Sequence, residues 1–425
     1  MKRRTFLAAT AVSASAFGLA ACGGNDAAPG GSDAPLSKDS AGELTLAYWD
    51  KNQTPTIEAN VAAFNAEYPN IKVNLSLSGW DDYWTKLSTQ ASGSNLADVF
   101  WMNGPSFQLY ASEGMLAELD GMEGVDWGNY PEALVTLYSY DGKHYGVPKD
   151  YDTIACAVDK GLFEQAGVDL PTEDWTWDDF KAAAKGVKDA NIGVWGVTGG
   201  PSAAGQSTYY NSIPQAGGFV IKDGQSGYDD PKSIEGLKFW VDLIEEGLCP
   251  SVDEIVATEP EPMFLARQAA MYWVGSWQPK TFLDQHPAPE DLMYLPLPKK
   301  EKQASVIHGL SYAAAAGGKN VEAAKALIKY LTDQKANETE AANATAIPAY
   351  NGTQAKWLEL NPDWDLSVFT KAAEEYSVPY PASKNTSAWS AKESEYLTPA
   401  FQLKTPIEEA AKQLADEMNT LLAAE

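Results

Sequence analysis

The sequence predicts an α/β protein of two halves, each built from alternating strands and helices. Three observations support this prediction. Strand-like and helix-like segments alternate from residue 44 to residue 104, and the alternation resumes with different residues from 144 onwards. No segment repeats at a fixed period, and 425 residues are enough for two domains. A strand–helix–strand order favours parallel pairing, with helices on both faces of a sheet.

The first half opens with a strand. Leu44, Leu46 and Tyr48 alternate with their neighbours and fall on one face. Residues 56–68 then carry apolar side chains at helical spacing, and Pro69 ends that helix. The elements expected next are a strand over 71–80, a helix over 81–93 and a buried strand over 97–104.

The second half shows the same kind of pattern. Thr176 is the predicted N-cap of a helix, and Asp179 three residues later completes a variant of the capping box. The last helix carries Pro406 in its first turn. The other expected elements are strands over 151–158 and 267–274 and helices over 160–167, 232–247, 323–333 and 405–424.

The N-terminus has the features of an export signal. Three basic residues, Lys2 to Arg4, precede an apolar stretch from Phe6 to Ala21. The sequence Leu-Ala-Ala-Cys that ends at Cys22 fits the bacterial lipobox, in which this cysteine is acylated; a plain signal peptide is the alternative. The general and twin-arginine export routes both remain open. We expect a lipid-anchored protein on the outer face of the bacterial cytoplasmic membrane.

The charge of the chain excludes some classes of partner. Loss of Lys2, Arg3 and Arg4 with the signal lowers the net charge from −27 to −30. Such a surface repels phosphate backbones and anionic headgroups, so we expect no nucleic-acid partner and membrane contact only through the lipid. The two remaining cysteines, Cys156 and Cys249, either pair or stay as free buried thiols.

The search for enzyme motifs is mostly negative. The three histidines, His144, His286 and His308, form no HExxH pattern, and no paired-cysteine zinc spacing is present. The stretch VGSWQ lacks the second glycine of a nucleophile elbow, and the glycine-rich GVTGGPSAAG lacks the Gly-Lys-Ser/Thr of a phosphate loop. We therefore predict no metal site and no cofactor.

Two carboxylates stand out in PKDYDT. Asp150 and Asp152 are two residues apart, so in an extended chain they share one face. Neighbours on one face suit accepting hydrogen bonds from adjacent sugar hydroxyls. A surface glycoside hydrolase that uses both acids is an alternative, although such enzymes place their carboxyl groups on opposite sides of a bond. A third interpretation is a pair of solvated acids in a loop.

Aromatic and amide or acidic side chains recur at predicted strand ends. These side chains are Trp49, Asp50 and Asn52 at the end of the first strand, Trp80 at the end of the second, and Trp101 and Asn103 at the end of the third. Ligands of open parallel sheets bind beyond the carboxyl ends of the strands. Flat rings and planar polar groups complement the C–H faces and hydroxyls of a sugar. A core role is the alternative for any single tryptophan.

The stretch AAMYWVGSWQPK divides its aromatic residues between two roles. Residues 270–274 alternate as a strand with both faces buried, so we predict that Trp273 belongs to the core. Gly275 and Ser276 end this strand and turn the chain. We predict that Trp277, which follows them, contacts the ligand.

Several segments in order resemble one protein family. They are LTLAYWDKN, YPNIKVNL, ADVFWMNG, HYGVPKDYDTIACAVDKGLFEQAGVDLPTEDWTWDDF, FLARQAAMYWVGSW, GGKNVEAAKALIKYLTD and TAIPAY. Together with the lipobox they are similar to family 1 of the extracellular solute-binding proteins, which serve ABC importers of oligosaccharides and include maltose-binding protein.

The resemblance implies a two-lobed periplasmic-binding-protein fold with the ligand cleft between the lobes. The implied hinge has three crossings, near 150–153, 298–309 and 346–351. The implied boundaries are a signal peptide over 1–21, a lipidated tether over 22–43, a first lobe over 44–150 and 309–348, and a second lobe over 151–308 and 349–425.

The resemblance also implies the ligand-binding residues. They are Trp49, Asp50, Asn52, Trp80, Trp101, Asn103, Asp150, Asp152, Tyr209, Tyr210, Trp277, His308, Gly309 and Trp389. The expected ligand is a neutral oligosaccharide, and the expected partner is the membrane permease of an importer, served by a monomer that is not an enzyme. Maltose itself is not favoured, because Glu393 stands where that member of the family carries a basic residue. The same fold binding a peptide or a metal chelate is a further alternative.

Overall fold

The computed structural model describes residues 36–201 and 205–425. The predicted signal peptide, Cys22 and most of the tether lie outside the described residues, so lipidation stays a prediction. In the part of the chain that the structure describes, no helix combines the length and apolar character needed to cross a membrane.

The larger sheet contains the first three predicted strands. Its order is β14-β6-β13-β3-β1-β2, and β15 pairs with β13. β1 pairs in parallel with β2 and β3, as predicted, whereas β13 runs antiparallel to β3 and β6. The strands are β1 (Gly42–Tyr48), β2 (Ile71–Leu77), β3 (Val99–Asn103), β6 (Gly146–Asp152), β13 (Ser305–Ala314), β14 (Ile347–Pro348) and β15 (Ser377–Pro379).

The second sheet has the order β12-β7-β11-β8, with β11 parallel to β8 and antiparallel to β7. Its strands are β7 (Ile154–Asp159), β8 (Trp195–Thr198), β11 (Ala269–Gly275) and β12 (Leu292–Leu295). Two short hairpins are formed by β4 (Ser139–Tyr140) with β5 (Lys143–His144) and by β9 (Ile221–Lys222) with β10 (Gln225–Ser226).

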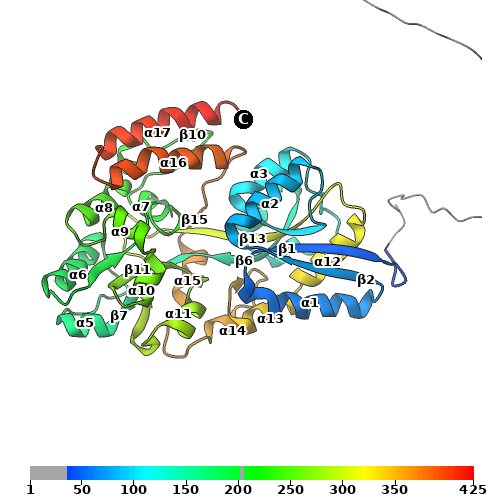
Figure 1. Ribbon diagram of the computed structural model, residues 1–425, viewed down its shortest axis with the longest axis horizontal. Coiled ribbons are helices and arrows are strands. Elements are labelled where there is room, and N and C mark those ends of the chain that lie inside the picture. Colours follow the sequence, from blue (N-terminus) through cyan, green and yellow to red (C-terminus); the bar gives the residue numbers. More distant parts are fainter. Residues whose placement is uncertain (1–35, 202–204) are drawn as a thin grey trace, which may run out of the picture. The chain divides into compact units, whose positions relative to one another are not determined.

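Helices surround both sheets (Figure 1). Those near the first sheet are α1 (Thr54–Glu67), α2 (Trp80–Ser92), α3 (Gly104–Ser112), α4 (Glu132–Leu137), α12 (Val321–Thr332), α13 (Gln334–Asn343) and α14 (Ala355–Leu358). The others are α5 (Lys160–Ala166), α6 (Trp177–Asp189), α7 (Tyr209–Gln215), α8 (Pro231–Glu245), α9 (Val252–Ala257), α10 (Pro260–Leu265), α11 (Pro279–Gln285), α15 (Ser367–Glu375), α16 (Thr386–Phe401) and α17 (Ile407–Leu422). The predicted α/β class is confirmed.

Helices on both faces explain why the central strands β3 and β11 are buried along their whole length. Every residue of β3 and of β11 is buried. Trp273 on β11 has no exposed surface and packs against Trp240, with ring centroids 5.0 Å apart. Its predicted core role is confirmed.

The chain passes between the two sheets at short segments. Thr153 alone separates β6 of the first sheet from β7 of the second, and residues 296–304 separate β12 from β13. After the third predicted crossing, α14 contacts α13, a helix near the first sheet. The third crossing and the lobe boundaries stay predictions.

Local sequence signals gave mixed results. The capping box of Thr176 and Asp179 is confirmed at the start of α6. Trp80 begins α2 instead of ending β2, and Pro406 is the N-cap of α17 instead of lying in its first turn. Within the described part of the chain, Cys156 and Cys249 form no disulfide, and both are buried.

Candidate functional site

A cavity of about 530 Å³ is lined by residues that follow strands of both sheets. Trp49 follows β1, and Trp277 follows β11. Eight of the predicted binding residues meet here. They are Trp49, Asp50, Asn52, Trp80, Asp150, Asp152, Trp277 and His308.

One wall of the cavity is a cluster of tryptophan rings. Trp80 is 51% exposed and packs edge-on against Trp49, with centroids 5.1 Å apart. Trp49 in turn rests on Trp101 at 4.9 Å and 89°. Trp101 has no exposed surface, so its ring supports the wall from beneath and does not line the cavity. Edge-on contacts of this kind are favourable beyond the area that they bury.

The other wall carries a single exposed indole. Trp277 is 40% exposed, and its ring folds back over the end of β11. A Cβ atom at Gly275 would lie 1.9 Å from the Cζ3 atom of that ring. Gly275 is therefore required for this ring position, because any side chain there would displace the indole. The Gly275 N–H also donates to Gln278 Oε1 at 2.9 Å.

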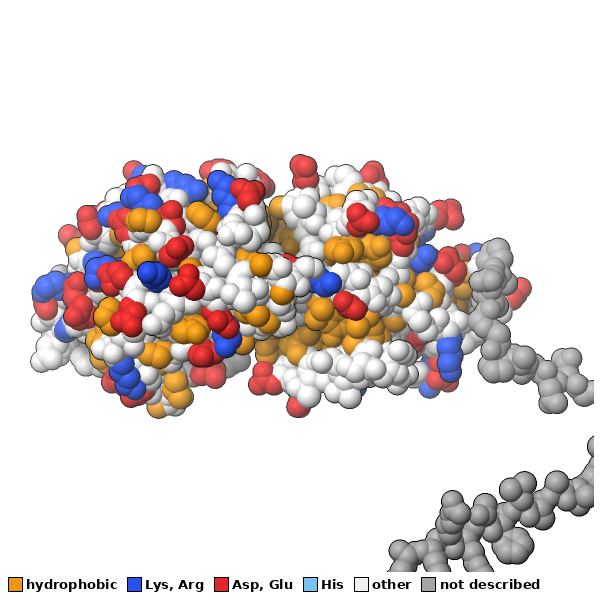
Figure 2. Space-filling view, turned by 90° about the horizontal axis from the view of Figure 1, so that it is seen from above, with side chains coloured by type: hydrophobic (Ala, Val, Ile, Leu, Met, Phe, Trp, Pro, Cys, Tyr) orange, Lys and Arg blue, Asp and Glu red, His pale blue; other side chains and the backbone are white. Residues whose placement is uncertain are grey.

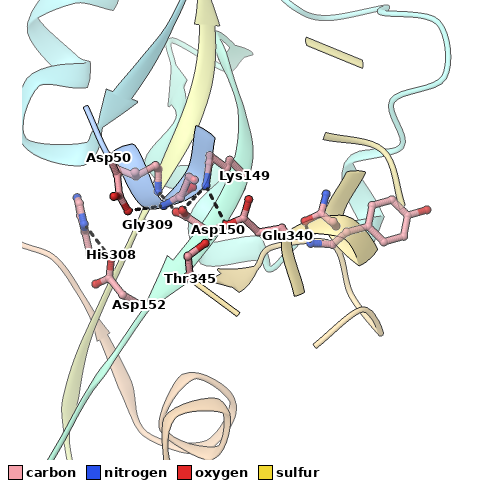
Figure 3. Close-up of polar contacts among 12 residues, drawn as sticks. Asp50, Lys149, Asp150, Asp152, His308, Gly309, Glu340 and Thr345 are labelled. Atoms are coloured by element: carbon pink, nitrogen blue, oxygen red, sulfur yellow. Dashed lines mark hydrogen bonds and ion pairs between the residues drawn. The ribbon is translucent and has the colours of Figure 1, made fainter. Parts of the chain in front are cut away.

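The floor of the cavity rests on a buried charge network (Figure 3). The Lys149 ammonium donates to Asp150 at 2.7 Å and lies 3.8 Å from Glu340. Thr345 donates to Glu340 at 3.0 Å. The other oxygen of Asp150 accepts the Leu310 N–H at 2.9 Å. Both carboxylate oxygens of Asp150 are thus engaged within the protein.

The network shifts the acid–base behaviour of its members. Burial alone would lower the pKa of Lys149, but Asp150 and Glu340 raise it above its ordinary value. Burial raises the pKa of the Glu340 carboxyl, and Lys149 offsets part of that rise. The floor therefore holds a compensated set of charges.

Asp152 has a different environment. Its Oδ1 accepts from Gln206 Nε2 at 2.6 Å, and its Oδ2 lies 3.6 Å from Nδ1 of His308 (Figure 3). His308 Nε2 accepts the Gly104 N–H at 3.2 Å. An accepting Nε2 is unprotonated, so the proton of this neutral imidazole sits on Nδ1 and faces Asp152.

Two polar atoms of the lining are buried without a hydrogen-bond partner among the described residues. They are Ser276 Oγ and Gln53 Oε1, on side chains that are 2% and 5% exposed. Buried polar groups in proteins are nearly always satisfied, and each exception calls for an explanation. A polar ligand in the cavity would supply the missing partners.

Comparison with known proteins identifies the family. The model of the bacterial extracellular solute-binding proteins matches residues 50–338. The chain belongs to this family.

Named relatives are consistent with this membership. The solute-binding protein is 29% identical over 242 residues to a putative binding protein of Brucella abortus, a match that spans 55% of this chain and 58% of that one. It is 27% identical to the diacetylchitobiose binding protein of Streptomyces coelicolor, over 99% of each chain. It also resembles the structure of an ABC substrate-binding protein from Listeria monocytogenes in complex with cycloalternan, with 25% identity, a TM-score of 0.83 and coverage of 90% and 100%. The two-lobed fold predicted from the sequence is thereby confirmed.

Three of the other predicted binding residues are buried away from the cavity in this solute-binding protein. The hydroxyls of Tyr209 and Tyr210 both donate to Glu393 on α16. Trp389, one turn earlier on α16, is fully buried and donates to Ser383 Oγ at 2.9 Å. None of the three lines the cavity, because their polar atoms are used inside the second lobe.

Asn103 and Gly309 serve the backbone of the first lobe. The Asn103 side chain caps α3 by accepting the Ser106 N–H at 3.1 Å. A Cβ atom on Gly309 would lie 2.3 Å from the Asp150 carbonyl oxygen, so a glycine here allows β13 and β6 to approach closely. Neither residue lines the cavity.

Sequence reasoning missed other lining residues. They are Gln53, Tyr151, Gln206, Glu261, Ser276, Thr281, Leu310 and Ala346. Ser276 lies inside the Gly-x-Trp turn and Gln53 directly follows Asn52, so proximity to a selected residue was an available signal. Glu261 on α10 and Thr281 on α11 had no such signal, because packing between separate helices brings them to the cavity.

Proposed function

We propose that this solute-binding protein captures an oligosaccharide in the cavity and delivers it to the membrane subunits of an ABC importer. The observation that carries the proposal is the pair of exposed indoles, Trp80 and Trp277, which reach one cavity from separate lobes. Sugar rings present C–H faces to such indoles and hydroxyls to polar atoms like Ser276 Oγ.

The relatives support the same class of ligand. The Streptomyces coelicolor relative, whose match covers nearly all of both chains, is a diacetylchitobiose binding protein. The Listeria monocytogenes structure holds cycloalternan. We infer a similar ligand for this protein, held as a monomer through Cys22 at the outer face of the membrane.

The uptake step would use closure of the two lobes. A ligand that contacts Trp80 and Trp277 together favours the closed arrangement, because only there do both walls touch it. The passage from β6 to β7 at Thr153 is short enough to act as one hinge segment. The permease would then distinguish the closed protein from the open one.

Hydrolysis by Asp150 and Asp152 receives less support. Asp150 is 4% exposed, and its oxygens are already bonded to Lys149 and to the Leu310 N–H. A general acid or nucleophile needs a carboxyl oxygen that can reach the substrate. Capture without turnover is therefore the function that the geometry supports best.

The test is calorimetric titration of the protein and of Trp277→Ala with a panel of oligosaccharides. We expect one-to-one binding without product, and a loss of at least tenfold in affinity for the variant, about 1.4 kcal/mol. The melting temperature without ligand should stay nearly unchanged, because the ring is partly exposed.

The matched control is Trp127→Ala. Trp127 is also partly exposed, but it stacks on His144 at 4.1 Å and does not line the cavity. The Trp127→Ala variant should bind the sugar with unchanged affinity. Equal affinities of the Trp277→Ala variant and the parent protein would refute the proposal.

A further inference from the structure

The cavity lining is one-sided in charge. It includes four carboxylates, those of Asp50, Asp150, Asp152 and Glu261, and among the described residues it includes no lysine or arginine. Lys149 compensates Asp150, but it is 3% exposed and lies behind the lining. Three acidic groups remain without a cation.

Neutral donors alone satisfy these three groups. Asp50 accepts from the Asn52 N–H at 2.8 Å and from Gln53 Nε2 at 3.3 Å. Glu261 accepts from Gln278 Nε2 at 2.6 Å.

Asp152 accepts from Gln206 Nε2 at 2.6 Å and faces the neutral imidazole of His308. When a ligand expels water from the cavity, carboxylates of like sign repel one another more strongly, because the local dielectric constant falls.

A second feature of the cavity also favours a ligand that carries a positive charge. The buried Gln53 Oε1 is an unpartnered atom that can only accept a hydrogen bond. The unpartnered acceptor and the three acids without a cation both favour a ligand that supplies hydrogen-bond donors and positive charge. An ammonium group supplies three donors and one positive charge, and the exposed faces of Trp80 and Trp277 attract cations through their ring quadrupoles.

We propose that the preferred ligand of this cavity is a sugar that carries a protonated amine, such as an oligomer of glucosamine. This inference rests on the proposed function and narrows its ligand class. It departs from the neutral sugar that the sequence predicted, because the sequence did not show which acids of the cavity lack a cation.

The experiment compares chitotriose, which has free amines, with its N-acetylated form and with maltotriose, at about pH 6 and low salt. We expect the amine form to bind with one-to-one stoichiometry and at least fivefold more tightly than the acetylated form. Raising the salt concentration to about 0.5 M should reduce this ratio, because it screens charge attraction. Equal or tighter binding of the acetylated form overturns the inference and leaves the proposed function intact. Binding of none of the three sugars and of no member of the oligosaccharide panel overturns both.

Variants separate a specific site from the general acidity of the chain. Glu261→Gln and Asp152→Asn should each lower the preference for the amine form at least threefold. The matched control is Glu58→Gln, an exposed acid on α1 outside the cavity, which should keep the preference. If Glu58→Gln lowers it as much as Glu261→Gln does, overall charge explains the preference and the inference is wrong.

Discussion

The two lobes each bury a carboxylate, but they compensate it in different ways. Glu340 on α13 is 4% exposed and has the Lys149 ammonium beside it. Glu393 on α16 is 5% exposed and accepts only from tyrosine hydroxyls, those of Tyr209, Tyr210 and Tyr228. The first arrangement depends on an opposite charge, whereas the second depends on neutral donors, so the two should respond to different perturbations.

The lobes also support their exposed tryptophans differently. Trp80 belongs to a cluster in which Trp49 and Trp84 contact its ring. Trp277 has no ring partner among the described residues and depends on the missing side chain of Gly275. Several ring contacts fix the position of Trp80, whereas the position of the Trp277 ring depends on Gly275. On the face seen in Figure 2, acidic and basic side chains are interspersed.

The largest effect is expected for Lys149→Met. This change leaves Asp150 and Glu340 buried without a cation and should lower the free energy of unfolding by about 3–5 kcal/mol. Urea denaturation measures this change in the free energy of unfolding. The exposed Lys238→Met on α8 is the control and should cost less than about 0.5 kcal/mol. Adding Glu340→Gln to Lys149→Met should recover part of the loss, and no recovery would mean that Glu340 is not coupled to Lys149.

The second effect is a pH dependence that comes from Glu393. Burial, offset in part by the tyrosine hydroxyls, raises the pKa of this carboxyl from 4.5 to about 7. Glu393 ionises at a lower pH in the unfolded chain than in the native protein. Its contribution to the free energy of unfolding is therefore complete below about pH 4.5 and is lost as the pH rises to about 7. The loss should be on the order of a few kcal/mol.

The measurement compares the free energy of unfolding of the parent protein with that of Glu393→Gln across this range. Between about pH 4.5 and 7, the free energy of unfolding of the parent protein should fall relative to that of the variant. Above about pH 7, the two free energies should change with pH in parallel. The raised pKa of Glu340 acts on both proteins and cancels in the difference. Glu395→Gln, an exposed acid on the same helix, should not change the slope. If the two free energies of unfolding change in parallel over the whole pH range, the pKa of Glu393 is not raised in the native protein.

The smallest effect is expected for Gly275→Ala. The new Cβ displaces the Trp277 ring, so sugar affinity should fall about tenfold, or about 1.4 kcal/mol. Adding this change to Trp277→Ala should cost little more, since the two act through one ring. Gly317→Ala is the control, because no atom lies within 4 Å of the position of its Cβ. Additive losses would mean that Gly275 acts separately from Trp277.

Much of the fold was predictable because its signals are local. Alternation identified β1 and β11, helical spacing identified α1 and α12, and the capping residues identified the start of α6. The pairing of β13 between β3 and β6 was not predictable, because these strands are far apart in the sequence.

The candidate site was predictable in part. Trp49 and Trp277 were selected because each follows a strand, and strand ends are where such sheets bind ligands. Trp101 was selected by the same rule, but it lies within β3 and beneath Trp49. Glu261 follows no such rule, yet its position on α10 adds a charge to the cavity.

The sequence by itself determined the succession of strands and helices along the chain and the core role of Trp273, because periodicity and apolar runs act over a few residues. Only the tertiary structure decided which indoles form walls and which support them. That choice depends on neighbours from distant segments, as with Trp80 above Trp49, and on the space left by one glycine beside Trp277. It also decided which acids are compensated, because the partner of Glu340 on α13 lies on β6 and the partners of Glu393 lie outside its own helix.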